Sequence, residues 1–104
     1  MFISKIKRIL ESVKKFDWGK GNINKNLLKH RVTDKETEEI FANNPKFIIE
    51  DEKHSIKEKR YMLWGITNKE RKLTVIFTIR KNKIRIISSR DMNRKERSFY
   101  EKES

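Results

Sequence analysis

The sequence has no cysteine, a single proline and three glycines in its 104 residues. Without cysteine the chain can form neither a disulfide framework nor a thiolate zinc site, and it lacks a cysteine nucleophile. This composition fits a reducing cytoplasm, where we expect the protein to act. The apolar runs are too short to span a membrane. Residues 1–15 also lack the apolar segment of a secretory signal.

Acidic side chains are scarce relative to basic ones. The chain has 15 Asp and Glu against 27 Lys and Arg, which gives a formal net charge of +12. The excess lies in the second half, because residues 53–104 carry 16 basic and six acidic side chains. Seven of the nine arginines follow residue 59, and Arg is well suited to bidentate contacts with phosphate. Such a charge indicates an anionic partner, which can be nucleic acid, a membrane surface or an acidic protein.

The first part of the chain has helical periodicity. Residues 2–15 form an N-terminal extension whose apolar stripe predicts an amphipathic helix with a basic outer face. We expect this helix to pack on the domain, and a helix lying on a membrane surface is the alternative. A short extended piece at residues 16–18 follows. Residues 22–31 predict a second helix, and Thr33 and Glu36 form the capping box of a third that ends near Ala42.

From Lys46 the pattern changes to the alternation typical of strands. Strands are predicted from Phe47, over 61–66, over 73–80 and over 84–87, with short turns that make neighbours antiparallel. We expect residues 88–91 to leave the sheet. Asn93 and Glu96 can cap a final helix that frays at its end.

These elements predict an α+β fold with N-terminal helices, a small antiparallel sheet of three to four strands and a C-terminal helix. The helices are expected to cover one face of the sheet, and the other face is expected to carry polar and basic side chains. Residues 16–104 are expected to form a single domain.

Several classes of site find no support in the sequence. The two histidines, His30 and His54, lie in different predicted elements, and lysines surround the potential ligands of residues 51–54, so we expect no metal site. We expect no cofactor either, because the residues around Gly19 and Gly21 lack the spacing of a phosphate-binding loop. Ser88 and Ser89 lie outside any nucleophile motif. Dehydrogenases, P-loop enzymes and serine hydrolases are therefore unsupported.

The remaining candidates are cations and proton carriers suited to phosphate chemistry: Lys29, His30, Arg60, Tyr61, Arg80, Arg85, Arg90, Arg97 and Tyr100. RNA can be cleaved by its own 2′-hydroxyl without a cofactor. One group must accept the hydroxyl proton, cations must hold the phosphate, and an acid must protonate the leaving oxygen. Purely structural interpretations also exist. Lys29 and His30 suit the end of a helix, Arg60 can pair with Glu58, and Arg97 and Tyr100 can dock the last helix.

An ordered series of motifs adds a family resemblance. The motifs are Phe16-Asp17-Trp18, Asn26-x-x-Lys29-His30-x-Val32, Glu39-Ile40-Phe41, Asp51-x-x-His54-Ser55-x-x-Glu58-x-Arg60-Tyr61, Gly65, Val75-Ile76-Phe77-Thr78-x-Arg80, Ile84-Arg85-Ile86-Ile87-Ser88-Ser89-Arg90 and Arg94-x-Glu96-Arg97-x-x-Tyr100-Glu101. On these residues the chain resembles the BrnT toxins of bacterial type II toxin–antitoxin systems, from Phe16 to Glu101. Three residues depart from the family pattern. Arg31 replaces a Gly that helps to end the helix and aim the Lys-His pair, Ser89 replaces an Ala, and Asn22 stands where a Lys is common.

The resemblance implies a RelE-like fold and an RNA-cleaving activity that arrests growth. It also implies a BrnA-type antitoxin partner with a ribbon-helix-helix DNA-binding domain, which would bring the complex to its own operator DNA. On this basis we expect catalytic roles for Lys29, His30, Arg80 and Arg90. We expect RNA contacts from Arg60, Lys83, Arg85, Arg94, Arg97 and Tyr100. A metal-independent endoribonuclease is therefore the predicted function.

Two other classes remain open. A non-catalytic nucleic-acid-binding module would carry the same basic stripe, although it would usually add exposed aromatic side chains for base stacking. A catalytically inactive antitoxin partner would tolerate the loss of Arg80 or Arg90. If the enzyme hypothesis holds, replacing either arginine with alanine should relieve toxicity with little loss of fold.

Overall fold

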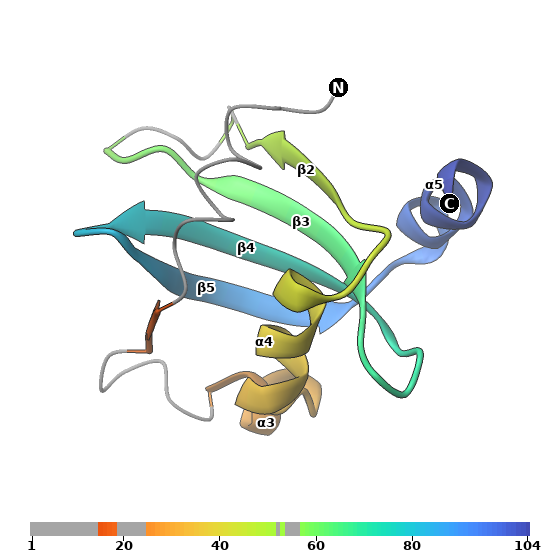
Figure 1. Cartoon of the computed structure of the whole chain (residues 1–104), viewed down its shortest axis with the longest axis horizontal. Helices are drawn as coiled ribbons and strands as arrows, with labels where there is room; N and C mark the ends of the chain where they lie inside the picture. The colour runs from red at the N-terminus through yellow and green to blue at the C-terminus, as the bar shows by residue number, and fades with distance from the viewer. Residues whose placement is uncertain (1–14, 19–24, 52, 54–56) are drawn as a thin grey trace.

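The computed structural model describes residues 15–18, 25–51, 53 and 57–104. Its five strands form one sheet in the order β1-β5-β4-β3-β2 (Figure 1). The strands are β1 (Phe16–Asp17), β2 (Phe47–Glu50), β3 (Tyr61–Ile66), β4 (Lys72–Arg80) and β5 (Lys83–Asp91), and the described helices are α3 (Lys25–His30), α4 (Asp34–Ala42) and α5 (Arg94–Glu103). The predicted helix over residues 2–15 and the start of the predicted helix over 22–31 lie outside the described residues.

The prediction of a three- to four-stranded antiparallel sheet is wrong. The sheet has five strands and is mixed, because β1 runs parallel to β5, with Phe16 opposite Ile84. A two-residue strand carries no alternation that the sequence could show. Helices α3 and α4 also do not precede the sheet, since they lie between β1 and β2 in the chain.

Strand β5 is longer than predicted. It continues through Ser88–Asp91, which we expected to leave the sheet, and Ser89 pairs with Val75 of β4. The two serines concealed this extension because they interrupt the apolar pattern. Ser89 is nevertheless fully buried, and its hydroxyl accepts a hydrogen bond of 2.8 Å from Thr37 of α4. A register shift beside Ile76 and Phe77 further disturbs the simple alternation.

The main core lies between the sheet and α4. Leu63, Val75 and Phe77 are fully buried, and Ile40 packs onto the sheet from the helix. Gly65 permits this close approach, since a Cβ atom there would come within 2.9 Å of the Ile40 Cβ. The capping box that Thr33 and Glu36 were predicted to form is present at the start of α4.

Helix α5 packs against the opposite face of the sheet, so the prediction that all helices share one face is wrong. Trp64 and Phe47 point away from the main core, and Phe99 of α5 packs on both, with ring centroids 5.2 and 5.9 Å apart. Tyr100 is buried there, and its hydroxyl donates a hydrogen bond of 2.6 Å to the Pro45 carbonyl. Figure 1 shows α5 apart from α3 and α4. It keeps its helical form to Glu103, beyond the predicted point of fraying.

None of the helices in the described part of the chain has the length and hydropathy that crossing a membrane requires.

Candidate nucleic-acid interface

The sheet face that α4 does not cover, called the open face below, carries five of the predicted site residues. In β4 and β5, Thr74 lies opposite Arg90, Thr78 lies opposite Arg85, and Arg80 lies opposite Lys83. Because side chains alternate along a strand, the residues on this face include Arg60, Arg80, Lys83, Arg85 and Arg90. The prediction that one sheet face is basic is therefore confirmed.

A shallow hollow of about 300 Å³ lies on the open face. We call it the arginine hollow, and it is lined by Asp51, Arg60, Met62, Ile76, Ile87, Ser88 and Arg90. Its apolar side chains come from three adjacent strands, and its charged groups come from Arg60, Arg90 and Asp51. The fold thus brings together two arginines that are 30 positions apart in the sequence.

Arg90 is held in place by Glu96 of α5. Its two terminal nitrogens donate hydrogen bonds of 2.7 and 3.0 Å to the two oxygens of the carboxylate. Burial opposes the charge on Glu96. The hydrogen bonds from Arg90, from the Asn93 backbone N–H and from Thr74 outweigh this effect and lower the Glu96 pKa to about 2. Glu96 also completes the capping box that Asn93 was predicted to begin. The guanidinium therefore has a fixed orientation at one side of the arginine hollow.

Arg80 occupies a different part of the open face. It lies at the end of β4, about half-exposed, and donates a hydrogen bond of 2.8 Å to Glu58. The Glu58 partner proposed for Arg60 is therefore used by Arg80. Arg90 pairs with Thr74 of β4, and Arg80 lies six residues further along that strand. Six residues of strand span about 20 Å. Arg85 lies between these levels, 3.6 Å from the carboxylate of Asp17, and Lys83 is exposed beside Arg80.

Lys29 and His30 lie at the C-terminus of α3. Lys29 is exposed and His30 is partly buried. His30 is close enough to Asp91 for its charge to contribute to lowering the Asp91 pKa, although the hydrogen bond from Arg71 is the largest cause. The four predicted catalytic residues are thus distributed over three places: the end of α3, the arginine hollow and the end of β4.

Arg71 organises the region around Lys29 and His30, although it is not among the predicted site residues. Its guanidinium donates hydrogen bonds to both oxygens of Asp91, at 2.7 and 3.0 Å, and contacts the Glu36 carboxylate at 3.2 Å. It also donates to the backbone carbonyls of Arg31, at 2.9 Å, and His30, at 3.4 Å. The side chain ties the ends of α3 and β5 to the start of α4. These partners come from three separate segments, so no local motif could have indicated it.

Arg31 ends α3 in the left-handed conformation, with φ 57°. Its backbone N–H donates to the Leu27 carbonyl at 3.1 Å, as in a helix that closes with a left-handed residue. Glycine adopts this conformation without the steric cost that a side chain adds. The backbone at this position therefore suits glycine better than arginine.

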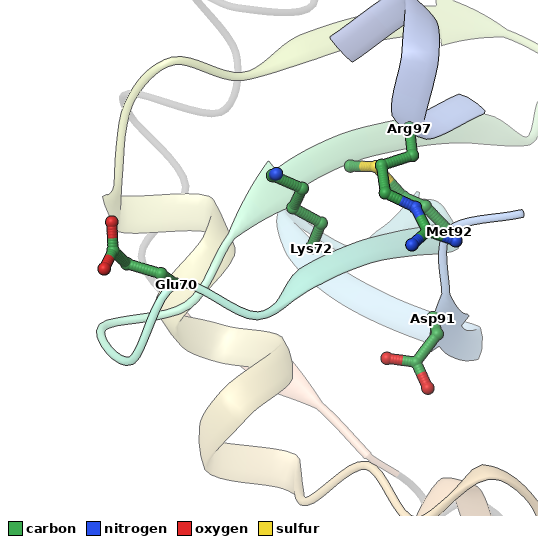
Figure 2. A pocket seen from close by; sticks show the side chains of 5 residues that line it. All are labelled: Glu70, Lys72, Asp91, Met92 and Arg97. Atoms are coloured by element: carbon green, nitrogen blue, oxygen red, sulfur yellow. The ribbon is translucent and has the colours of Figure 1, made fainter. Parts of the chain in front are cut away.

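The remaining predicted residues lie on α5. Arg94 and Arg97 are exposed, whereas Tyr100 is buried with its hydroxyl bonded to Pro45. Arg97 lines a second hollow together with Glu70, Lys72, Asp91 and Met92 (Figure 2). Lys72 pairs with Glu101 at 2.5 Å and Asp91 pairs with Arg71, so two of the four charged residues of this hollow form ion pairs with residues outside it. Figure 2 shows Glu70 and Asp91 at its opposite ends.

Within the described residues, no three His, Asp or Glu side chains gather in a way that could hold a metal ion.

The open face, its arginines and the end of α3 all lie in a segment that matches a known family. Residues 18–96 match the family described as the ribonuclease toxin, BrnT, of type II toxin–antitoxin systems. The chain belongs to the BrnT family. The matched segment runs from Trp18 to Glu96, so it includes the carboxylate that holds Arg90. A search of curated proteins finds no match to the chain. Membership means a ribonuclease toxin that has an RNA substrate and an antitoxin partner.

Proposed function

We propose that this BrnT protein is a metal-independent endoribonuclease whose RNA substrate lies across the open face. The observation that supports this most is the arginine hollow, in which Arg60 and Arg90 flank a floor of Met62, Ile76 and Ile87. A phosphate can sit between the two guanidinium groups. The apolar floor excludes water beneath it, and charge interactions are stronger where water is excluded.

The chemistry follows from those cations. The 2′-hydroxyl next to the scissile phosphate attacks the phosphorus atom, and the arginines stabilise the negative charge that develops on the phosphate oxygens. Lys29 and His30 were the predicted proton carriers, but the end of α3 approaches Asp91, which alternates with Arg90 along β5 and so lies on the opposite face of the sheet from the hollow. The products are a fragment with a 2′,3′-cyclic phosphate and a fragment with a 5′-hydroxyl.

Other basic residues are proposed to hold the flanking RNA. Arg80, Lys83 and Arg85 extend the basic surface along the open face, and Arg94 and Arg97 extend it over α5. Such contacts bind the phosphate backbone and carry little sequence information. Their contribution to RNA affinity should fall as the salt concentration rises.

The direct test is to incubate the purified protein with RNA in EDTA and to identify the ends of the fragments. We expect cleavage to continue, with 2′,3′-cyclic phosphate or derived 3′-phosphate ends. Activity that disappears with chelation and returns with Mg²⁺, or fragments with 3′-hydroxyl ends, would contradict the proposal. RNA binding without cleavage would favour the non-catalytic alternative.

We further propose that the antitoxin is of the BrnA type, with a ribbon-helix-helix domain through which the complex contacts operator DNA, and that the toxin acts in the cytoplasm. The net charge of +12 supports an acidic neutralising surface. Expression of the chain alone should arrest bacterial growth, and co-expression of such an antitoxin should relieve the arrest. Normal growth despite verified expression of folded protein would contradict the toxin function.

A further inference from the structure

Asp51 introduces a carboxylate into the arginine hollow. It directly follows β2 and lines the hollow together with Arg60, Ser88 and Arg90. Asp51 precedes Arg60 by nine residues but Arg90 by 39, so the sequence alone does not place its carboxylate beside both arginines, and Asp51 is not among the predicted site residues. The sheet order removes this separation, because β2, β3, β4 and β5 lie side by side.

The backbone fixes the side of the sheet on which Asp51 lies. Its N–H donates a hydrogen bond of 2.8 Å to the Arg60 carbonyl, which continues the β2–β3 pairing by one residue. Ile49 pairs with Met62 one step earlier, so Asp51 shares the face of Ile49 and Met62. Glu50, the preceding residue, pairs with Tyr61 and belongs to the opposite face.

Two other carboxylates near the basic open face lie outside the lining of the hollow. Glu96 accepts hydrogen bonds from Arg90, Thr74 and the Asn93 backbone N–H at the start of α5. Glu58 is bonded to Arg80, away from the hollow. Among the described residues that line the hollow, Asp51 is the carboxylate.

We propose that Asp51 is the catalytic base that accepts the proton of the attacking 2′-hydroxyl. This inference rests on the proposed function. As the proton moves to the Asp51 carboxylate, the 2′-oxygen forms a bond to phosphorus and the bond from phosphorus to the 5′-oxygen breaks. A separate acid gives a proton to the departing 5′-oxygen, and Arg60 and Arg90 hold the phosphate. No other reactant is consumed.

The first test compares Asp51→Asn with Glu50→Gln. Each variant removes one carboxylate, and the two positions are adjacent but lie on opposite faces. We expect Asp51→Asn to slow single-turnover cleavage about 100-fold or more, within the range typical of a lost general base. RNA affinity should stay the same or rise, since a negative charge has been removed. Glu50→Gln should cleave within about twofold of the wild-type rate.

The second test separates a base from an acid and from a structural residue. A substrate with sulfur in place of the bridging 5′-oxygen has a leaving group that departs without a proton. This substrate should restore the rate of a variant that lacks the acid, whereas Asp51→Asn should remain slow on it. Asp51→Glu keeps the carboxylate and should retain more activity than Asp51→Asn. Thermal melting curves show the temperature range in which each variant is folded, and the cleavage rates are compared within that range.

The outcomes distinguish this inference from the proposal on which it rests. If the wild type fails to cleave RNA in EDTA, the metal-independent mechanism fails. If the wild type cleaves and Asp51→Asn cleaves equally fast, the proposed function stands and Asp51 is not the base. Restoration of Asp51→Asn by the sulfur-containing substrate would also overturn the assignment, because that result is expected of an acid.

Discussion

At the scale of single residues, the main chain of Arg31 adopts an unfavourable conformation and makes two hydrogen bonds. Its φ of 57° lies in the left-handed region, which costs a residue with a side chain about 1–2 kcal/mol. Its carbonyl accepts a hydrogen bond from Arg71, and its N–H bonds Leu27. Both hydrogen bonds would survive a change of side chain, so the side chain itself adds mainly the steric cost.

Arg31→Gly should therefore stabilise the protein by about 1 kcal/mol, because glycine adopts the left-handed conformation freely. The gain is reduced by the larger entropy of glycine in the unfolded chain. Urea unfolding of both proteins measures the change. Arg31→Ala is the matched control and should give no such gain, since alanine keeps the Cβ atom. A loss of stability in the glycine variant would contradict the steric cost assigned to the Arg31 side chain.

At the scale of elements, α5 is attached to the open face through Glu96. This carboxylate caps the helix, binds Arg90 and accepts a hydrogen bond of 2.9 Å from Thr74 in β4. Its folded-state pKa of about 2 lies below the ordinary value of 4.5. A lowered carboxylate pKa stabilises the fold above the ordinary value, and this contribution is lost as the pH falls from about 4.5 to about 2.

Glu96→Gln should therefore reduce stability at neutral pH and make it less sensitive to acid. The wild type should lose more stability than the variant when the pH falls from about 5 to about 3. Thermal melts across this range measure both effects. Glu103→Gln, at the exposed end of the same helix, should retain the acid sensitivity of the wild type. Parallel losses in wild type and Glu96→Gln would show that Glu96 does not couple the helix to pH.

The same contacts change the expectation for the two arginine variants. Arg90→Ala leaves the Glu96 carboxylate without its ion-pair partner and should cost on the order of 2 kcal/mol, the worth of hydrogen bonds to a charged group. Arg80→Ala removes an exposed partner of Glu58 and should barely move the urea midpoint. Both variants should lose toxicity. Equal midpoints for the two variants would show that Arg90 does not anchor α5.

Strong local patterns made several elements predictable. The alternation in β3 and β4 and the two capping boxes identified strands and helices that the structure confirms. The extended piece at residues 16–18 was predicted, but its parallel pairing with β5 was missed because two residues show no period. The end of β5 was missed because Ser89 is buried through a hydrogen bond with Thr37.

The sequence predicted the kinds of residue that form the site better than it predicted which of them the fold brings together. Its second half predicted a basic face, and Arg60 and Arg90 do lie together in the arginine hollow. It could not show that Asp51 joins them, because this depends on the register in which β2, β3, β4 and β5 pair. Arg71 was equally hidden, since its partners come from α3, α4 and β5.

At the scale of the whole molecule, the side chains that form the core and the arginines that carry much of the excess positive charge lie on different parts of the sheet. Helix α4 covers the face with the main core, and α5 covers part of the other face through Phe99 and Tyr100. The rest of that face presents the arginines to the surroundings. A ribonuclease toxin must bind a polyanion, and its surplus of basic residues can gather there without disturbing the core.

The proposed mechanism requires RNA to be cleaved in the arginine hollow. The most direct measurement is the single-turnover cleavage rate of Arg60→Gln in EDTA, with the folded state checked by thermal melts. Lys69→Gln is the control, because it also removes one positive charge but lies in the exposed turn between β3 and β4. We predict that Arg60→Gln slows cleavage about 100-fold and that Lys69→Gln stays within about twofold of the wild type. A folded Arg60→Gln protein that cleaves at the wild-type rate would contradict the account.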